Sequence, residues 1–493
     1  ALPFTGDEAY FWYWGKNPDW GFYDHPPMIG WWMGALSWLS DAPAVQRLPA
    51  LLGPILIAVL TRALLAPLGA TVSYGAATLL VLAPLNAVNV AVTTDAPLMV
   101  FTFLAMAAYL RALRTGRSVD YLLAGLLLGG ALLSKYFAGM FALAVGGHRL
   151  VSRAPGRWRG FLLLVAGSLP AAALMIAWNQ AHCWPNVMFN LVNRHGDAGF
   201  SWWRPPMYAA SLAYVIGVPV LAWLLRDRPR AASAPEPSGR VRDAALAWMA
   251  GLPFGLFALM SLAKPVGLHW LASFVAPATW LFAVRAGERG PAEAARRLRI
   301  AIRVAAAVAV VHWAVVIVLA ALPTETFTRW RSYPGLVLTK HGDELLAKLE
   351  PFRGDLWAME GYSPSVTLGY QDRARRTSRD NDRILVFGPG SSHARHDDML
   401  TDWRAAAGRN VLIILRAAPS SEFDRYFDRV ERHEVTVRGA TFHLVRGIGF
   451  RYEPYRDEVL EAVRARWYAV PAWLPLGPCY FCDRYFPDRA CHR

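Results

Sequence analysis

Ten long apolar runs occur along this chain of 493 residues, and they limit its fold more than any other property of the sequence. A helix needs about 20 apolar residues to cross the hydrocarbon core of a bilayer. Because 55% of all residues are apolar and only 18% are charged, the composition does not suit an ordinary soluble enzyme. The runs predict a polytopic bundle of transmembrane helices, at residues 45–62, 72–91, 96–112, 119–134, 136–150, 161–181, 207–225, 244–262, 269–285 and 303–322.

An eleventh apolar stretch, from Met28 to Leu39, is too short to span a membrane. Its three tryptophans, Trp31, Trp32 and Trp38, are typical of the headgroup zone. We therefore expect an interfacial helix over about 28–40.

Arginines indicate the orientation of these spans, because short cytoplasmic loops carry the excess of positive charge. With ten spans, every second loop is basic: residues 111–117, 149–159, 226–242 and 285–303 hold three, four, five and six arginines. This surplus accounts for the formal net charge of +15 without a nucleic-acid partner. The first loop and everything after Leu322 should then face outward, which leads us to expect a further span or signal upstream of Ala1.

After residue 322 the apolar runs shorten and charges become frequent. We expect a membrane domain over 1–322, interrupted by a flexible cytoplasmic linker at 230–239, and a periplasmic α/β domain over 323–493. The fold class is thus mainly α. Strands are predicted at 384–387, 411–415 and 435–445, and helices at 343–349, 397–407 and 421–430.

Polar side chains at the outward ends of the spans are the candidate functional residues, since such groups are costly in a membrane. Carboxylates there can accept a proton from a hydroxyl nucleophile, and cations can stabilise a phosphate. The candidates are Asp7, Glu8, Asp24, His25, Asp95, Lys135, Tyr136, Asn179, His182, Arg194, His195, Lys264 and His269.

Each candidate also has a structural interpretation. The acidic pair in the first loop could be solvated, the ammonium of Lys135 could extend to the interface, and Asp95 could cap a helix. The outer-loop histidines, His182 and His195, could be ordinary interfacial residues. The argument for function rests on the convergence of these groups on one face.

Two further motifs favour structural roles. Residues 388–392, with the sequence GPGSS, lack the lysine of a phosphate-binding loop, so a tight turn is the preferred interpretation. His393, His396, Asp397 and Asp398 resemble metal ligands, but they lie where a helix should begin, and helix capping explains them equally well.

The C-terminal tail contains Cys479, Cys482 and Cys491, followed by His492. In the cytosol this spacing would suggest a zinc site, whereas an oxidising exterior favours one disulfide among the three cysteines. The pairing cannot be read from the spacing, and Cys183 is left either free or as a partner.

Three segments resemble the bacterial branch of the C-type (GT-C) membrane glycosyltransferases, which includes the lipid A aminoarabinose transferase and relatives of the protein O-mannosyltransferases. They are GDEAYFWYW at 6–14, GFYDHPP at 21–27 and TDAP at 94–97. The segment from Trp178 to Trp184 is also similar to this branch, without an assigned role. The likeness extends over nearly the whole chain.

The resemblance implies inverting transfer of a sugar from a polyprenyl-phosphate donor to an envelope acceptor on the periplasmic face of a bacterial inner membrane. It implies that Asp7, with Glu8 beside it, is the general base, and that Asp95 is a second acidic residue of the site. Lys135 lies where relatives carry a lysine, but His25 stands where the aminoarabinose transferase has a phosphate-contacting lysine. Lys135, Arg194 or Lys264 is then expected to supply the charge.

The expected partners are the lipid-linked donor, membrane lipids and an acceptor that could be lipid A, another glycolipid, a glycan or a protein. No cofactor is required, because a lipid monophosphate carries less charge than a nucleotide diphosphate; a divalent metal is possible but not indicated. A transporter or flippase for lipid-linked sugars is the main alternative. It predicts inverted repeats and mid-membrane charges, and the sequence shows neither.

A third interpretation makes the outer domain a binding module that the spans anchor in the membrane. We rank this interpretation last, because ten spans exceed what an anchor requires.

Overall fold

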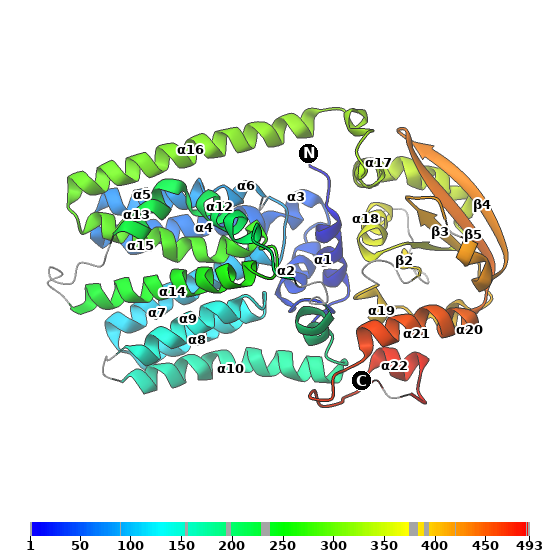
Figure 1. Cartoon of the computed structure of the whole chain (residues 1–493), viewed down its shortest axis with the longest axis horizontal. Helices are drawn as coiled ribbons and strands as arrows, with labels where there is room; N and C mark the ends of the chain where they lie inside the picture. Colours follow the sequence, from blue (N-terminus) through cyan, green and yellow to red (C-terminus); the bar gives the residue numbers. More distant parts are fainter. Residues whose placement is uncertain are drawn as a thin grey trace.

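The computed structural model describes residues 2–88, 90–152, 156–193, 199–227, 237–373, 383–388, 394–419, 421–489 and 491. Figure 1 shows a helix bundle on one side, a mixed α/β layer on the other, and the short helices α1 (Gly6–Lys16), α2 (Met28–Ser37) and α3 (Pro43–Gln46) between them. The bundle helices are α4 (Leu48–Leu65), α5 (Ala70–Val81), α7 (Asp95–Thr115), α8 (Ser118–Leu132), α9 (Ala138–Val151), α10 (Arg157–Ala181), α12 (Arg204–Ile216), α13 (Val218–Arg226), α14 (Pro237–Ser261), α15 (Val275–Gly287) and α16 (Pro291–Ala321).

Five helical segments are individually long and apolar enough to cross a membrane, which makes this a polytopic membrane protein. They are Pro43–Leu68, Asp95–Thr115, Arg157–Ala181, Arg242–Ser261 and Pro291–Ala321. Helices α12 and α13 together form a sixth candidate, bent by 105° at Gly217, whose φ is +92°. The most apolar stretch of α16 is not buried by other described residues, as expected for a helix that faces lipid.

Four of the predicted spans are shorter than a full crossing. The run at 72–91 contains only α5 and the short α6 (Leu85–Val88), because Pro84 cannot continue the hydrogen-bond ladder. Helices α8 and α9 have 15 and 14 residues and are separated at Ser134–Phe137. The run at 269–285 begins as a 3₁₀ helix, Leu268–Phe274, and continues as the 13-residue α15.

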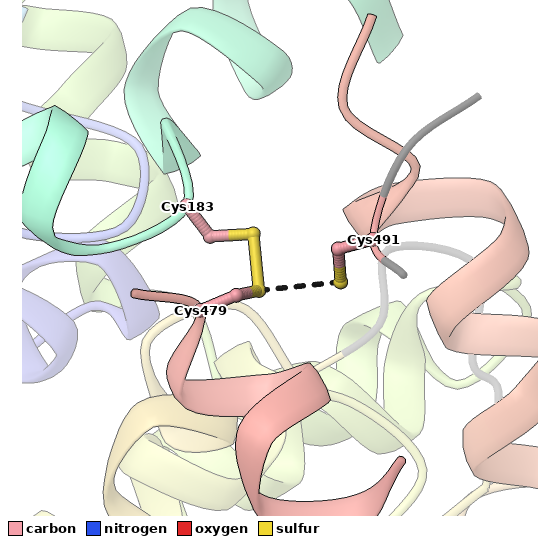
Figure 2. A group of neighbouring side chains, drawn as sticks. All are labelled: Cys183, Cys479 and Cys491. Carbon is pink, nitrogen blue, oxygen red and sulfur yellow. Dashed lines mark hydrogen bonds between the residues drawn. A yellow bond between two sulfur atoms is a disulfide. The ribbon is translucent and has the colours of Figure 1, made fainter. Parts of the chain in front are cut away.

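The two ends of the bundle differ in chemistry. Helices α7, α9, α13 and α15 all end on the side away from the α/β layer, and the arginine-rich segments follow those ends (Figure 1). Helix α10 instead ends beside the layer, and Cys183 in the loop after it forms a disulfide with Cys479 (Figure 2). Within the bundle, the arginine-rich segments therefore lie at one end and the Cys183–Cys479 disulfide lies at the other.

The cysteine prediction is confirmed for one disulfide within the tail, Cys482–Cys491. Cys479 pairs outside the tail, with Cys183, so the structure selects the partner that the spacing left open. The sulfurs of Cys183, Cys479 and Cys491 lie within 4.8 Å of one another, which is close enough for them to bind one metal ion. Figure 2 shows, however, that Cys183 and Cys479 are joined by a disulfide. A disulfide sulfur carries no thiolate charge for zinc.

The α/β layer contains one sheet with the strand order β2-β1-β3-β5-β4. β1, β2 and β3 are parallel, and β5 is antiparallel to both β3 and β4. Buried leucines of α17 and α18 cover one face of the central strand β3, whose five residues are all buried. The elements are α17 (Tyr333–Leu349), β1 (Leu356–Met359), α18 (Tyr362–Asp372), β2 (Leu385–Val386), α19 (Asp397–Leu400), β3 (Val411–Leu415), β4 (Phe427–Val437), β5 (Ala440–Phe450), α20 (Tyr452–Tyr455), α21 (Glu461–Val463) and α22 (Tyr480–Tyr485).

Three predicted elements of this layer are wrong. The helix expected at 397–407 consists only of α19 and a separate 3₁₀ turn, Trp403–Ala406. Residues 421–430 are a 3₁₀ turn, Ser421–Tyr426, followed by the start of β4 rather than one helix. The strand expected at 435–445 is a hairpin, because Arg438 and Gly439 both take positive φ, at 49° and 78°. Two such residues make the tight turn that reverses a strand.

Candidate functional site

Helix α1 carries the first carboxylates of the site. Thr5 caps the helix, since its Oγ1 accepts a hydrogen bond from the backbone of Glu8 and the Glu8 carboxylate accepts one from the backbone N–H of Thr5. The helix packs closely on α2, where a Cβ on Gly15 would lie 2.6 Å from the backbone nitrogen of Gly34. This close crossing brings α1 against the loop that contains Asp24 and His25.

A cavity of about 440 Å³ opens beside the first turn of α1. Both the membrane helices and the α/β layer contribute to its wall, so it lies at the boundary between the two halves of the molecule. Six of the predicted site residues line it: Asp7, Asp24, His25, Lys135, Tyr136 and His269. The structure thus brings together groups that are up to 262 positions apart in the sequence.

Asp7 is the carboxylate of this cavity that has no partner. Within the described part of the chain it forms no ion pair and no hydrogen bond, and its side chain is exposed to the cavity. The surrounding protein raises the pKa of Asp7 by desolvation, and the positive charge of Arg395 opposes that shift. An accessible carboxylate with a raised pKa is suited to accept a proton.

Glu8, which was predicted to be catalytic together with Asp7, is instead fully buried and points away from the cavity wall. Its two carboxylate oxygens accept hydrogen bonds from Arg47 at 2.6 and 2.7 Å, and one also accepts the backbone N–H of Val92 at 3.0 Å. These bonds occupy the carboxylate, so Glu8 joins α1 to α4 and to the loop before α7. The physical reason is the helix geometry, because adjacent residues on a helix point about 100° apart.

Asp95 and Lys135 form one unit at the edge of the cavity. The Nζ atom of Lys135 lies 2.8 Å from both carboxylate oxygens of Asp95, which is 1% exposed. Thr94, rather than Asp95, occupies the cap position of α7. Since an ammonium group has three donors and Asp95 accepts two, one remains for a ligand of the cavity, which Lys135 lines. The geometry makes Asp95 a positioning residue for this cation.

Asp24 and Arg395 link the membrane half to the α/β layer. Arg395 Nη1 lies 2.8 Å from Asp24 Oδ2, and the Tyr10 hydroxyl donates to Asp24 Oδ1 at 3.3 Å. The Arg395 guanidinium also lies over the Tyr362 ring, 4.0 Å from its centroid. The cavity therefore has a second cation, supplied by a residue that the sequence did not identify.

His25 and Tyr136 are held by neighbouring groups. Burial lowers the pKa of His25, which keeps the imidazole neutral near pH 7. The Tyr136 hydroxyl donates to Asn186, which in turn donates to the backbone carbonyl of Tyr23 at 2.9 Å. Both side chains can offer polar atoms to a ligand without adding charge.

Three other predicted residues that the structure describes, Asn179, His182 and Lys264, do not line the cavity. Asn179 accepts the backbone N–H of Asn186 at 3.1 Å and so shapes the loop after α10. The ring of His182 stacks on Trp178, with ring centroids 4.5 Å apart. Lys264 lies outside the cavity wall. Arg194 and His195 fall outside the described residues.

The grouping at 393–398 is structural where it is described. Asp397 accepts the backbone N–H of Val386 at 3.2 Å and pairs with Arg383, while Asp398 accepts the Tyr468 hydroxyl at 3.0 Å. His396 is buried against the rings of Trp14 and Phe22. His393 and residues 389–392 lie outside the described residues, whereas Gly388, with φ at +89°, has the conformation of a turn glycine.

Sequence reasoning missed Arg395, Asn190 and Tyr362, which also line the cavity. Arg395 lies within the sequence HARHDD, whose histidines and aspartates suggested a metal or a cap. Nothing local distinguishes its arginine from the others in the chain. Its role depends on Asp24, which is 371 residues away.

Comparisons with known proteins give matches of two kinds. A model for the family described as dolichyl-phosphate-mannose-protein mannosyltransferase matches residues 24–179. The lipid A galacturonosyltransferase RgtD of Rhizobium johnstonii is 33% identical over 190 residues, which cover 37% of this chain and 40% of that relative. The chain thus aligns with less than half the length of this curated relative.

The fold has solved counterparts. The crystal structure of ArnT from Cupriavidus metallidurans bound to undecaprenyl phosphate matches with a TM-score of 0.53 and 13% identity, covering 90% of this chain and 94% of ArnT. The structure of the same protein in the apo state gives a TM-score of 0.56 and 14% identity, again covering 90% of this chain and 94% of ArnT. At these identities the match shows a shared fold, which spans both the helix bundle and the α/β layer.

Proposed function

Because this chain shares the GT-C fold of membrane glycosyltransferases, we propose that it transfers a sugar from a polyprenyl-phosphate donor to a glycolipid acceptor such as lipid A. The observation that carries the proposal is the unpaired carboxylate of Asp7 in a cavity that also holds Lys135 and Arg395. The two similar proteins support the two substrates separately, since ArnT was crystallised with undecaprenyl phosphate and RgtD is a lipid A galacturonosyltransferase.

In the proposed reaction, Asp7 accepts the proton of the acceptor hydroxyl as its oxygen attacks the anomeric carbon of the donor sugar. The bond between that carbon and the phosphate oxygen breaks, and the configuration inverts. The departing polyprenyl phosphate gains one negative charge. Lys135 and Arg395 are the cations that would stabilise this charge, so the proposed reaction does not require a metal ion to compensate it.

The proposed location is the periplasmic face of a bacterial inner membrane. Two observations support it: the arginine-rich segments follow helix ends on the far side of the bundle, and both disulfides lie on the side of the cavity. Positive loops favour the cytoplasm, and disulfides persist in the oxidising periplasm.

The activity can be tested with the purified full chain in proteoliposomes that contain lipid A. With a polyprenyl-phosphate-linked galacturonic acid or aminoarabinose supplied, we expect the mass of lipid A to rise by one sugar residue. If labelled donor instead moves between leaflets with no gain in lipid A mass for either donor, the chain acts as a flippase and the proposed function is wrong. Hexose-linked donors, and acceptors other than lipid A, extend the same measurement to other specificities.

Lys135 is predicted to hold the donor phosphate. The test variant is the double substitution Asp95→Asn with Lys135→Met, because Lys135→Met alone would leave the buried Asp95 without its partner. A hydrogen bond to a charged group is worth about 1.5–3 kcal/mol, so we expect the Kd for undecaprenyl phosphate to rise roughly 10- to 150-fold. Binding can be followed by intrinsic tryptophan fluorescence.

Asp95→Asn alone is the matched control for this prediction. It keeps the lysine charge at the cavity and removes only the partner that positions it, so donor affinity should fall less than in the double variant. If the double variant binds undecaprenyl phosphate as tightly as the control does, Lys135 is not the phosphate ligand.

A further inference from the structure

A second cavity, of about 560 Å³, lies between α1 and α18. Its size is in the usual range for a small-molecule site. Tyr10 and Tyr362 line both this cavity and the one that contains Asp7, and their ring centroids are 4.8 Å apart. Two aromatic side chains therefore form a shared wall, and the proposed donor chemistry makes no use of the space behind it.

The floor of the second cavity is rigid and aromatic. Trp12 Nε1 donates to Asp41 at 2.8 Å, the Tyr370 hydroxyl donates to the Asp41 carbonyl at 2.6 Å, and Lys16 pairs with Asp41 at 2.8 Å. These bonds fix the rings of Trp12 and Tyr370, which offer the flat apolar surfaces on which sugar rings pack.

Arg373 supplies a positive charge that has no ion-pair partner among the described residues. Its guanidinium lies 3.8 Å from the centroid of the Tyr370 ring, and Nη1 donates to the Tyr370 carbonyl. No carboxylate of the described residues forms an ion pair with it. By contrast, the other cations of this cavity are paired, Lys16 with Asp41 and Arg383 with Asp397. A stacked arginine with unused donors is suited to bind a phosphate or a carboxylate.

Tyr13 adds a further aromatic surface to this cavity. Its ring lines the cavity, whereas its hydroxyl is inaccessible to solvent and has no hydrogen-bond partner among the described residues. The ring, rather than the hydroxyl, is therefore the part of Tyr13 that can contact a ligand.

We infer that this second cavity binds an anionic sugar group of the acceptor, with Arg373 contacting its phosphate or carboxylate and the rings of Trp12, Tyr13 and Tyr370 packing against the sugar. The inference rests on the proposed function. Asp7 and Tyr13 are six residues apart on α1, about 9 Å along the helix, so a headgroup of more than one sugar ring could reach from the anion site to the base. The same chemistry could instead come from the lipid-linked donor, and the experiment separates these sources.

The test uses the full chain in nanodiscs with three soluble probes: glucosamine 1-phosphate, galacturonic acid and uncharged N-acetylglucosamine. Binding is measured by saturation-transfer NMR. We expect both anionic probes to bind at least tenfold more tightly than the neutral one, and saturating undecaprenyl phosphate not to displace them. Displacement by undecaprenyl phosphate would assign the anion to the donor cavity and overturn the inference.

Arg373→Gln should weaken both anionic probes at least tenfold and leave the neutral probe unchanged. Tyr13→Ala should weaken all three probes several-fold, because it removes an aromatic surface that lines the cavity. Arg429→Gln, an exposed arginine on β4 of the same layer, is the matched control and should behave as the parent chain does. Equal anion binding by Arg373→Gln and Arg429→Gln overturns the inference.

A failure here is distinguishable from a failure of the proposed function. In the transfer assay, Arg373→Gln should raise the KM for lipid A with little change in kcat. If transfer occurs normally and neither that KM nor probe binding responds to Arg373, only the second site is wrong. If no transfer occurs with the parent chain but the probes still require Arg373, the site stands as an anionic-sugar site and the proposed reaction is wrong.

Discussion

Asp7→Asn is expected to lower kcat for sugar transfer roughly 10²- to 10⁴-fold, the usual contribution of a general base. Asparagine has nearly the same shape but cannot accept the acceptor proton. The variant should fold as the parent chain does, since Asp7 forms no ion pair or hydrogen bond within the described residues and desolvation already disfavours its charged form. Transfer is measured by mass spectrometry of lipid A, and folding by the Tm.

Donor binding is the control that isolates this step. Undecaprenyl phosphate should bind Asp7→Asn at least as tightly as the parent chain, because the substitution removes a negative charge from a cavity that receives an anion. Near-normal turnover by Asp7→Asn would show that another group accepts the proton. If Asp7→Asn instead bound the donor more weakly and had a lower Tm, Asp7 would have a structural role.

The pH profile provides a second measure of the same assignment. A base acts in its deprotonated form, so activity should rise with pH through the pKa of Asp7, which burial raises above the ordinary aspartate value. Arg395→Gln removes a positive charge that lowers this pKa. The acidic limb of the profile should therefore move to higher pH in that variant, whatever its effect on kcat. If the acidic limb does not move in Arg395→Gln, the group that titrates in this limb is not Asp7.

Arg47→Met is expected to lower the free energy of unfolding by about 3–5 kcal/mol, the cost of leaving one member of a buried ion pair alone. Glu8 is fully buried, and Arg47 is 7% exposed. Arg47 also donates to the carbonyls of Leu2 and Pro3, so the substitution releases the segment before α1 as well. Chemical unfolding in mild detergent measures the change.

Two variants control this second prediction. Glu8→Gln combined with Arg47→Met removes the uncompensated charge, so it should recover part of the lost stability. Arg404→Met breaks an exposed pair with Asp402 and should cost no more than about 1 kcal/mol. If Arg47→Met kept full stability but lost transfer, the pair would have a chemical role and the distinction drawn between Asp7 and Glu8 would be wrong.

The contrast between Asp7 and Glu8 shows where sequence reasoning stops. Both carboxylates occur in one motif, GDEAYFWYW, and the sequence assigned them jointly to catalysis. Arg47 contacts only one of them, and neither residue type nor spacing reveals which one. A similar limit applies to Asp95 and Lys135. The sequence placed both at outward helix ends, but only their 2.8 Å contact shows that the acid positions the cation.

Sequence patterns alone were enough to predict the polytopic helix bundle, the arginine-rich loops between its spans, the α/β layer after residue 322 and six of the residues that line the cavity. These features follow from local properties, namely the length of apolar runs, the placement of charge and the cost of polar groups near lipid. The tertiary structure decided the rest: the Cys183–Cys479 disulfide, the pairing of Asp24 with Arg395, and the second cavity between α1 and α18. Each of these joins segments hundreds of residues apart, and such contacts depend on how the whole chain packs, which no local pattern encodes.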